Sequence, residues 1–227
     1  MKEHPILFFA PMVREILAGR KTVTRRIIRQ MLCEGHGGPD RAALRAFDQS
    51  TGVATFGDAI PDDPCPVQVK CPYGVPGDRL WVRETHCRDD STVYFYRADE
   101  DAPECACPCD LSTGGYPEHC RYHPGCEGCY PSAIRWTPSI HMPRWASRIT
   151  LEITDVRVER LQEITEEDCI AEGTGLAKIQ DARDPCRGPL IDGFANAWDR
   201  INGKRAPWAI NPWVWVVAFR QLEAEHV

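Results

Sequence analysis

Residues 19–26 of the sequence, GRKTVTRR, gather side chains that could do chemistry within a single short stretch. Four cationic side chains and two threonine hydroxyls fall within these eight positions. Cationic side chains bind anionic or strongly polarised groups. Local cationic patches on a protein of net charge −6 suit a small ligand better than a long duplex. The stretch is therefore interpreted as a ligand-binding turn, and the alternative is a solvated basic turn.

A second group of residues has the composition of a metal site. Six thiols and two imidazoles fall within the 25 residues from 105 to 129. Zinc takes four nitrogen or sulfur ligands, and C-x2-C spacing lets two thiolates bind one ion from one tight turn. Since protein ligands would fill every position, we expect structural zinc, as one ion or as two that share a thiolate. The candidate ligands are Cys105, Cys107, Cys109, Cys120, His123, Cys126 and Cys129.

The basic turn lies between two predicted elements. Residues 11–18 carry an apolar stripe at helical spacing, and Gly19 follows where a left-handed cap ends a helix. Residues 22–28 form a β-branched run that predicts a strand. Thr24 and Arg26 then share one face of that strand, whereas Lys21 has to lie in the turn if it is to act together with Thr24.

The remaining pattern predicts an α+β fold, a small closed sheet of about six strands with helices packed outside. A long strand is expected over 149–158, with a bend at Thr154-Asp155. Thr165-x-x-Asp168 resembles a capping box that opens a short helix ending near Gly173. A further helix is expected over 191–201, stopped by Asn202-Gly203. Other strands are expected at 5–10, 67–71, 79–85, 92–97 and 213–219.

We interpret residues 1–227 as a single domain with two insertions. The first, at about 30–66, has no sustained periodicity and is expected to be irregular, with one helical turn near 42–47. The second, at about 99–132, holds the cysteine-rich cluster.

Composition limits the setting in which the chain works. No run approaches the ~18 consecutive apolar residues of a membrane span, and the first residues lack the apolar core of a signal peptide. A cytoplasmic protein without a membrane partner is therefore expected, in which cysteines are metal ligands or free thiols. The six cysteines outside the cluster are expected to be mostly buried or incidental thiols: Cys33, Cys65, Cys71, Cys87, Cys169 and Cys186.

The pattern Gly19-x-Lys21-x4-Arg26 resembles the signature of the ASCH domain, a small β-barrel similar to the PUA fold. Residues 16–26 resemble the N-terminal motif of the small bacterial ASCH-type N4-acetylcytidine amidohydrolases. The stretches 71–85 and 136–148 resemble a longer ASCH-like group common in phages and prophages, a pattern that marks a family without naming a reaction.

The resemblance implies an amidohydrolase that cleaves the exocyclic amide of N4-acylated cytidine or cytosine. Lys21 and Thr24 match the catalytic lysine and threonine of the small enzymes. A downstream catalytic glutamate is matched to Glu172, although a slip of one helical turn would select Asp168 or Glu167. Zinc is expected in the insertion only, with no cofactor in catalysis.

Two mechanisms are open for these residues. Neutral Lys21 could take the proton of Thr24, which then attacks the acyl carbon. This requires a lysine pKa near ~7–8, and neighbouring arginines and desolvation push the pKa of Lys21 that way. Alternatively, Glu172 activates water and cationic Lys21 stabilises the oxyanion. The candidates for substrate binding are Arg26, for the pyrimidine carbonyl or a carboxylate partner, and Tyr94 and Trp215 for stacking. Strand spacing would alternatively make the two aromatics core or rim residues.

Two rival functions would use the same residues. An RNA-binding or other nucleic-acid-binding module would place the basic turn on phosphates and use the zinc loop as a clamp. A metal-independent ribonuclease would direct the lysine, arginine and glutamate at a phosphodiester. Salt-dependent binding would favour the first rival, and cleavage of labelled RNA would favour the second.

Overall fold

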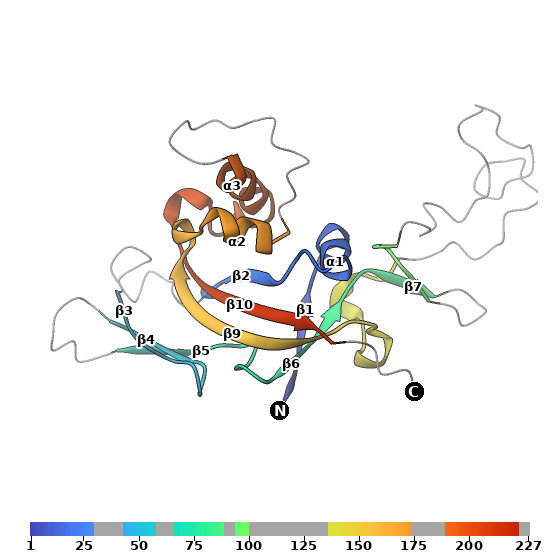
Figure 1. The fold of residues 1–227 in the computed structure, drawn as a ribbon, viewed down its shortest axis with the longest axis horizontal. Helices are drawn as coiled ribbons and strands as arrows, with labels where there is room; N and C mark the ends of the chain where they lie inside the picture. Colours follow the sequence, from blue (N-terminus) through green and yellow to red (C-terminus); the bar gives the residue numbers. More distant parts are fainter. Residues whose placement is uncertain (30–42, 58–65, 89–93, 100–135, 174–188, 223–227) are drawn as a thin grey trace, which may run out of the picture. The chain divides into compact units, whose positions relative to one another are not determined.

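The computed structural model describes residues 1–29, 43–57, 66–88, 94–99, 136–173 and 189–222 (Figure 1). Helices and strands are mixed, as the predicted α+β class requires. The chain divides into two compact units. Unit 1 consists of Met1–Ile6, Glu15–Val82 and Arg148–Val227, and unit 2 consists of Leu7–Arg14 and Arg83–Ser147. The predicted single domain with insertions stays a prediction.

Unit 1 is built on a five-stranded sheet with the order β1-β6-β9-β10-β2. The long strands β9 (Thr150–Arg160) and β10 (Trp213–Gln221) pair antiparallel, and β10 pairs in the same sense with β2 (Val23–Ile27). β1 (Glu3–Leu7) and β6 (Arg79–Arg83) complete the sheet. Among the described strands β1 and β2 are edges, so these strands form an open sheet and not the closed barrel that the resemblance implies.

The long strand β9 bends where the sequence predicts a bend. Ala218 of β10 pairs with Asp155, but the next residue, Phe219, pairs with Ile153. Thr154 is therefore an extra residue, a β-bulge that increases the local twist of the strand. Beyond the bulge, every second residue points to the same face, so the side chains at 155, 157 and 159 lie on one face of the sheet.

Two helices cover one face of β9, β10 and β2 (Figure 1). They are α2 (Glu166–Ala171) and α3 (Pro189–Asn202), and Asn202 ends α3 as predicted. Within the described part of the chain, no helix is long and apolar enough to cross a membrane. Burial of one apolar side chain contributes roughly 1.5–3 kcal/mol to the free energy of unfolding. The core between these helices and the sheet consists of Val23, Leu161, Ile164, Cys169, Leu190, Phe194, Ala195, Trp198, Trp208, Val214 and Val216.

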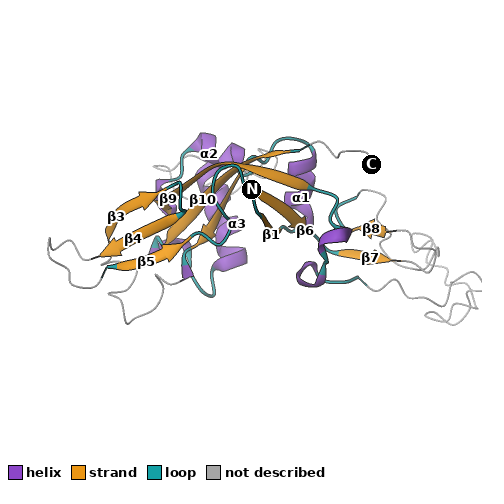
Figure 2. Ribbon diagram, turned by 90° about the horizontal axis from the view of Figure 1, so that it is seen from below, coloured by secondary structure: helices purple, strands orange, loops and turns teal. Residues whose placement is uncertain are grey.

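A separate three-stranded antiparallel sheet corrects the prediction for residues 30–66. It contains β3 (Ala43–Asp48), β4 (Val53–Gly57) and β5 (Val67–Lys70) (Figure 2). The irregular insertion with a helical turn near 42–47 is therefore wrong for the described residues. The β3–β4 turn is closed by Asp48, whose carboxylate accepts a hydrogen bond from the Ser50 amide at 2.9 Å.

Tertiary packing explains why this segment is a strand. The Phe47 ring lies 5.9 Å from the Trp215 ring, and the Phe56 ring lies 5.5 Å from the Trp213 ring. These contacts with β10 override the helix propensity of the alanine- and leucine-rich stretch at 42–46. Such distant contacts are invisible in the local sequence.

Unit 2 contains a short hairpin of β7 (His86–Arg88) and β8 (Tyr94–Tyr96), the latter within the strand predicted at 92–97. The helix α1 (Ala10–Leu17) begins in this unit. The Tyr96 hydroxyl donates to the Ala146 carbonyl at 3.0 Å. The cysteine-rich stretch 105–129 lies outside the described residues, so the zinc site stays a prediction.

Candidate active site

Lys21 lies in the turn between α1 and β2, where a joint role with Thr24 requires it. α1 ends at Leu17, and Gly19 has φ +69°, the left-handed conformation that caps a helix. The Lys21 amide donates to the Glu15 carbonyl at 3.0 Å, which ties the turn to the end of α1. β2 begins two residues later. The predicted order of helix, glycine, turn and strand is confirmed.

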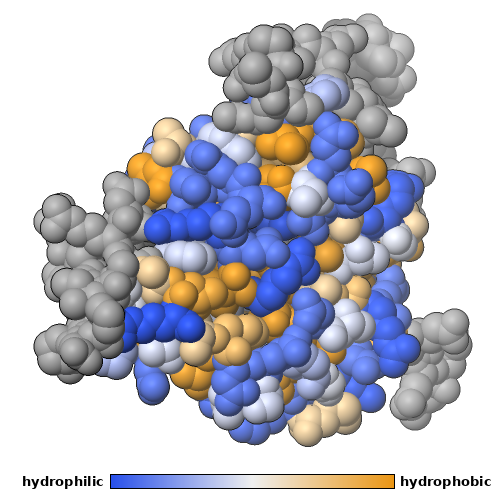
Figure 3. All heavy atoms as spheres, turned by 60° about the vertical axis from the view of Figure 1, so that its left-hand side comes forward, coloured by the Kyte–Doolittle hydropathy of each residue, from blue (hydrophilic) through white to orange (hydrophobic). Residues whose placement is uncertain are grey.

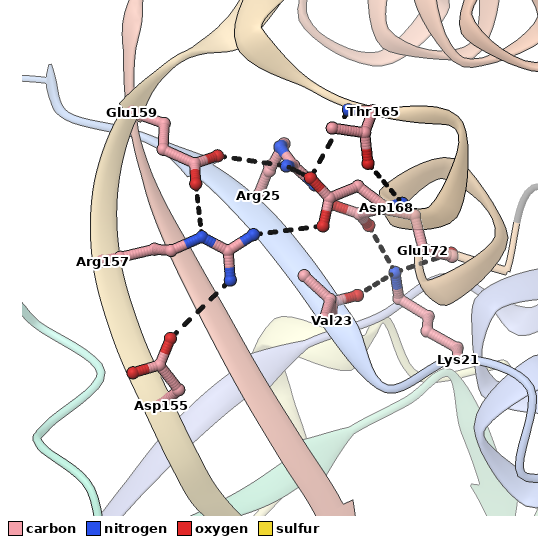
Figure 4. A network of polar contacts seen from close by, with 9 residues as sticks. All are labelled: Lys21, Val23, Arg25, Asp155, Arg157, Glu159, Thr165, Asp168 and Glu172. Carbon is pink, nitrogen blue, oxygen red and sulfur yellow. Dashed lines mark hydrogen bonds and ion pairs between the residues drawn. The ribbon is translucent and has the colours of Figure 1, made fainter.

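The Lys21 ammonium is buried and faces Glu172 (Figure 4). Nζ donates to Glu172 Oε2 at 2.6 Å, to the Glu172 carbonyl at 2.8 Å and to the Val23 carbonyl at 2.8 Å. An ammonium group has three hydrogens, so these contacts match its donor capacity. The exposed fraction is 0% for the Lys21 side chain and 7% for that of Glu172. The pair is a lysine amine held by a carboxylate in a largely buried site.

Glu172 reaches this position because α2 begins and ends as its sequence dictates. The Thr165 hydroxyl accepts from the Asp168 amide at 3.2 Å, and the Asp168 carboxylate accepts from the Thr165 amide at 3.5 Å, which confirms the predicted capping box. The Glu172 amide donates to the Asp168 carbonyl at 2.8 Å. Gly173 then turns with φ +74°, and a Cβ there would lie 2.9 Å from the Glu15 Cβ.

Arg25 joins β2 to the same helical turn. Its Nη2 donates to Asp168 Oδ2 at 2.6 Å, and its Nη1 lies 3.6 Å from Glu172 Oε1. Asp168 and Glu172 are four positions apart and therefore neighbours on one helix face. The Arg25 side chain is 0% exposed. Its guanidinium spans two carboxylates one helical turn apart.

β9 supplies the outer part of this charge network (Figure 4). Arg157 Nη2 donates to Asp168 Oδ1 at 3.1 Å, and its Nε donates to Glu159. Arg157 Nη1 lies 3.7 Å from Asp155 Oδ2, and Glu159 Oε2 accepts from Arg25 at 3.2 Å. The side chain of Asp155 is 42% exposed. The alternating charges thus run from the surface to buried Lys21.

Thr24, Arg26 and Trp215 share the opposite face of the sheet. The register pairs Arg26 with Trp215 and Thr24 with Val217, and directly paired residues of antiparallel strands point to one face. This agrees with the predicted common face of Thr24 and Arg26. Trp215 is 1% exposed and packs near Phe47, so in this structure it is a core residue, the alternative that strand spacing left open.

Tyr73 is a neighbour of Arg26 that the sequence did not single out. Burial lowers the pKa of Arg26, and the phenol of Tyr73 and the Glu172 carboxylate oppose that effect. Burial raises the pKa of Tyr73, and Arg26 and Arg29 oppose the increase. Tyr73 follows β5, and its only signal in the sequence was its place in the family-like stretch 71–85.

The burial of the network changes the pKa values of its members. Burial lowers the pKa of Lys21, the Glu172 carboxylate opposes this, and Arg26 and Arg25 add to it. Burial alone would raise the pKa of Asp168, but Arg25 and Arg157 outweigh burial and hold that pKa below its ordinary value. The charged form of Asp168 is therefore favoured in the folded chain.

The other predicted site residues are Tyr94 and the seven zinc ligands. Tyr94 belongs to β8 of unit 2, whereas Lys21 and Glu172 belong to unit 1. All seven predicted zinc ligands fall outside the described residues, and within the described ones no three histidine, cysteine or acidic side chains form a metal-binding group. The described cysteines are buried free thiols, as expected: Cys71, Cys87 and Cys169.

The surface of unit 1 also carries apolar side chains. Figure 3 shows hydrophobic residues between hydrophilic ones on the face drawn. The exposed large apolar residues of unit 1 include Leu17, Ile170 and Ile201. Exposed apolar side chains are ordinary in folded proteins, so we assign them no role.

The arrangement favours carboxylate and oxyanion chemistry over a lysine base. Lys21 Nζ faces oxygen acceptors of Glu172 and Val23, so it serves as a hydrogen-bond donor in this geometry. Among the described contacts, no hydrogen bond joins the Thr24 hydroxyl to Lys21. Glu172 is the group in this pair that can accept a proton.

Comparisons of the chain with known protein families, with curated proteins and with solved structures found no match. The chemistry of this site is therefore argued from its own residues. The contact that carries the argument joins Lys21 to Glu172.

Proposed function

We propose that the chain is an amidohydrolase that cleaves the exocyclic amide of N4-acylated cytidine or cytosine. The observation that carries the proposal is the 2.6 Å contact between Lys21 Nζ and Glu172 Oε2. The resemblance to the N4-acetylcytidine amidohydrolases selects Lys21 through residues 16–26 and matches Glu172 to the downstream glutamate. Their burial supports catalysis because electrostatic interactions are stronger where water is excluded.

The favoured mechanism uses water as the nucleophile. The Glu172 carboxylate takes a proton from water, and the water oxygen bonds to the acyl carbon. The carbonyl oxygen becomes negative and is stabilised by the Lys21 ammonium. When the C–N4 bond breaks, Glu172 returns the proton to N4, which yields the amino group of cytidine and a carboxylic acid. Because Glu172 is 7% exposed, the acyl group has to reach it through a small opening or after a local movement.

Substrate recognition is assigned to two residues of β2, Arg26 and Thr24, on the face of the sheet opposite to Arg25. Arg26 is half-buried on β2 and interacts electrostatically with Glu172 and Tyr73. A guanidinium donates in a planar fork, which suits the pyrimidine carbonyl. Thr24 is 3% exposed, and its hydroxyl is proposed to orient water or substrate and not to attack. Stacking by Tyr94 remains a proposal.

The remaining parts of the proposal concern the fold and its setting. The five-stranded sheet of unit 1 is proposed as the counterpart of the ASCH-type barrel, and the chain as a cytoplasmic, phage-related member of that group. Structural zinc in the 105–129 stretch would order that stretch, since metal binding supplies folding free energy to cysteine-rich segments. Catalysis is assigned to Lys21 and Glu172.

The proposal is tested by incubating the purified chain with N4-acetylcytidine and separating the products by chromatography. We expect release of cytidine and acetate. A parallel incubation with labelled single-stranded RNA measures cleavage and salt-dependent binding. RNA cleavage without cytidine release would replace the amidohydrolase with a ribonuclease, and RNA binding alone would replace it with a binding module.

A further inference from the structure

Arg25 contacts the two carboxylates of the α2 region that face β2 (Figure 4). Nη2 donates to Asp168 at 2.6 Å, and Nη1 lies 3.6 Å from Glu172 Oε1. Nη1 and Oε1 are both buried, and neither has a hydrogen bond among the described residues. They face each other as a close ion pair.

Glu172 needs such a tie because of its place in the chain. α2 contains six residues, and Glu172 follows the last of them as the C-cap. Helix ends fray, and a long acidic side chain loses rotamer freedom when it is held in one position. The Lys21 ammonium holds Oε2 alone. A second contact at Oε1, an ion pair and not a hydrogen bond, would limit rotation of the carboxylate.

Only a guanidinium can make both of the contacts that Arg25 has with Asp168 and Glu172, besides its hydrogen bond to Glu159. Arginine presents several N–H donors in a rigid planar fork, whereas lysine carries one compact charge. Asp168 and Glu172 are separated by one helical turn, which is about 5.4 Å along the axis. Arg25 therefore contacts Asp168 with Nη2 and Glu172 with Nη1.

We propose that Arg25 is a positioning residue that ties Glu172 to Asp168 across one turn of α2 and so keeps the Glu172 carboxylate against Lys21. The inference rests on the proposed function for the catalytic part given to Glu172. The tie itself can be tested without turnover.

The competing explanation is that Arg25 is only a nearby positive charge. The charged groups around Lys21 are Glu172, Arg25 and Arg26, with Glu15 at the end of α1. If Arg25 acts only through its charge, its removal raises the pKa of Lys21, because a like charge has gone. If Arg25 positions Glu172, its loss releases that carboxylate, and the pKa of Lys21 falls. The two explanations therefore predict opposite changes in the pKa of Lys21 when Arg25 is removed.

The experiment is an NMR titration of the lysine side chains in the full-length chain, labelled with 13C at Cε. The sequence contains five lysines, at 2, 21, 70, 178 and 204, so Lys21→Arg identifies the Lys21 signal. The main variant is Arg25→Lys, which keeps the charge but lacks the fork. We expect the pKa of Lys21 to fall by about one unit or more in this variant, since an opposite charge within contact distance shifts a pKa by roughly 1–3 units. An unchanged pKa would overturn the proposal.

A double-mutant cycle identifies Glu172 as the group that moves. In Glu172→Gln the carboxylate is gone, so adding Arg25→Lys should cause no further fall in the pKa of Lys21. Equal falls in both backgrounds would contradict the proposal. Arg25→Gln is the second variant, with the same fall expected, and a rise there would mean that Arg25 acts through charge alone. Arg20→Lys is the matched control, because Arg20 is exposed and paired with Glu15.

Kinetics add a readout that depends on the proposed function. Arg25→Lys should lower kcat for N4-acetylcytidine about tenfold or more while KM stays within about threefold, because a misplaced base affects the transition state more than binding. A larger KM with unchanged kcat would contradict the positioning role. If the wild-type chain releases no cytidine, the proposed function fails, and the titration of Lys21 still decides the inference.

Discussion

Lys21 and Glu172 lie 151 positions apart in the chain and meet through a 2.6 Å hydrogen bond between Nζ and Oε2. Two local structures bring them together. The glycine-capped end of α1 leaves Lys21 in a turn, and the capping box of Thr165 and Asp168 starts α2 so that Glu172 follows its last residue. Two short sequence signals therefore determine where Lys21 and Glu172 lie, and the fold of unit 1 brings the two segments together.

Replacing Thr24 by valine tests the choice of nucleophile. Valine keeps the β-branched shape that suits a strand but lacks the hydroxyl. We expect Thr24→Val to retain more than about a tenth of kcat, a loss under ~1.4 kcal/mol, because water is the proposed nucleophile. Steady-state kinetics of the folded variant give the answer. A loss of several thousand-fold would make Thr24 the nucleophile.

Asp168→Asn is expected to remove an acid-sensitive part of the stability. The folded chain holds the pKa of Asp168 below its ordinary value, so its charge stabilises the fold above the ordinary pKa, and this stabilisation is lost as pH falls through the folded-state pKa. The difference in unfolding free energy between wild type and variant should therefore shrink from pH ~6 to pH ~3. Urea denaturation at several pH values measures it.

The control for that experiment is Glu166→Gln, an exposed residue in the first turn of the same helix. It should show a difference near zero throughout. A difference for Asp168→Asn that stays constant with pH would mean that its ion pairs with Arg25 and Arg157 contribute nothing to folding.

Gly173→Ala is expected to destabilise the chain more than Gly19→Ala. Both glycines are in the left-handed region, with φ +74° and +69°, so alanine costs about 1–2 kcal/mol of backbone strain at either position. At Gly173 a Cβ would also lie 2.9 Å from Glu15 Cβ and 3.2 Å from Lys21 Cβ, whereas at Gly19 nothing lies within 4 Å. Urea unfolding of the two variants compares them. Equal losses would show that the Lys21 turn is not crowded.

Metal analysis tests the cysteine-rich stretch. We expect the purified chain to contain zinc, bound by thiolates among residues 105–129. In the sequence these positions lie outside the segments that make up unit 1. Chelation should therefore remove zinc while the tryptophan fluorescence of unit 1, which contains Trp81, Trp198, Trp208, Trp213 and Trp215, still reports a cooperative unfolding transition. A chain without zinc, or a collapse of unit 1 on chelation, would contradict this assignment.

Local signals predicted much of unit 1. The capping box at Thr165, the end of α3 at Asn202-Gly203 and the bend at Thr154 all depend on residues that are close in sequence. The strand at 43–48 could not be predicted, because its stability depends on ring contacts with β10. Propensity alone favoured a helix there.

In the site, too, some residues could be identified from the sequence, whereas others depend on contacts between distant parts of the chain. Lys21 and Glu172 were selected by resemblance, and the structure places them in contact. Arg25 was only one cation among several in the basic stretch. Its role depends on which strand face it occupies and on Asp168, which is 143 positions away. Arg157 gave no signal at all, since an arginine in a strand usually faces solvent.

The most direct test of the account compares cytidine release from N4-acetylcytidine by the wild-type chain, Glu172→Gln and Glu167→Gln. Both variants make the same chemical change within one stretch, but Glu172 is held by Lys21 whereas Glu167 is exposed. We predict turnover by the wild type, a loss of about a hundredfold or more in Glu172→Gln, as for removal of a general base, and unchanged turnover in Glu167→Gln. No release by the wild type, or full activity in Glu172→Gln, would contradict the account.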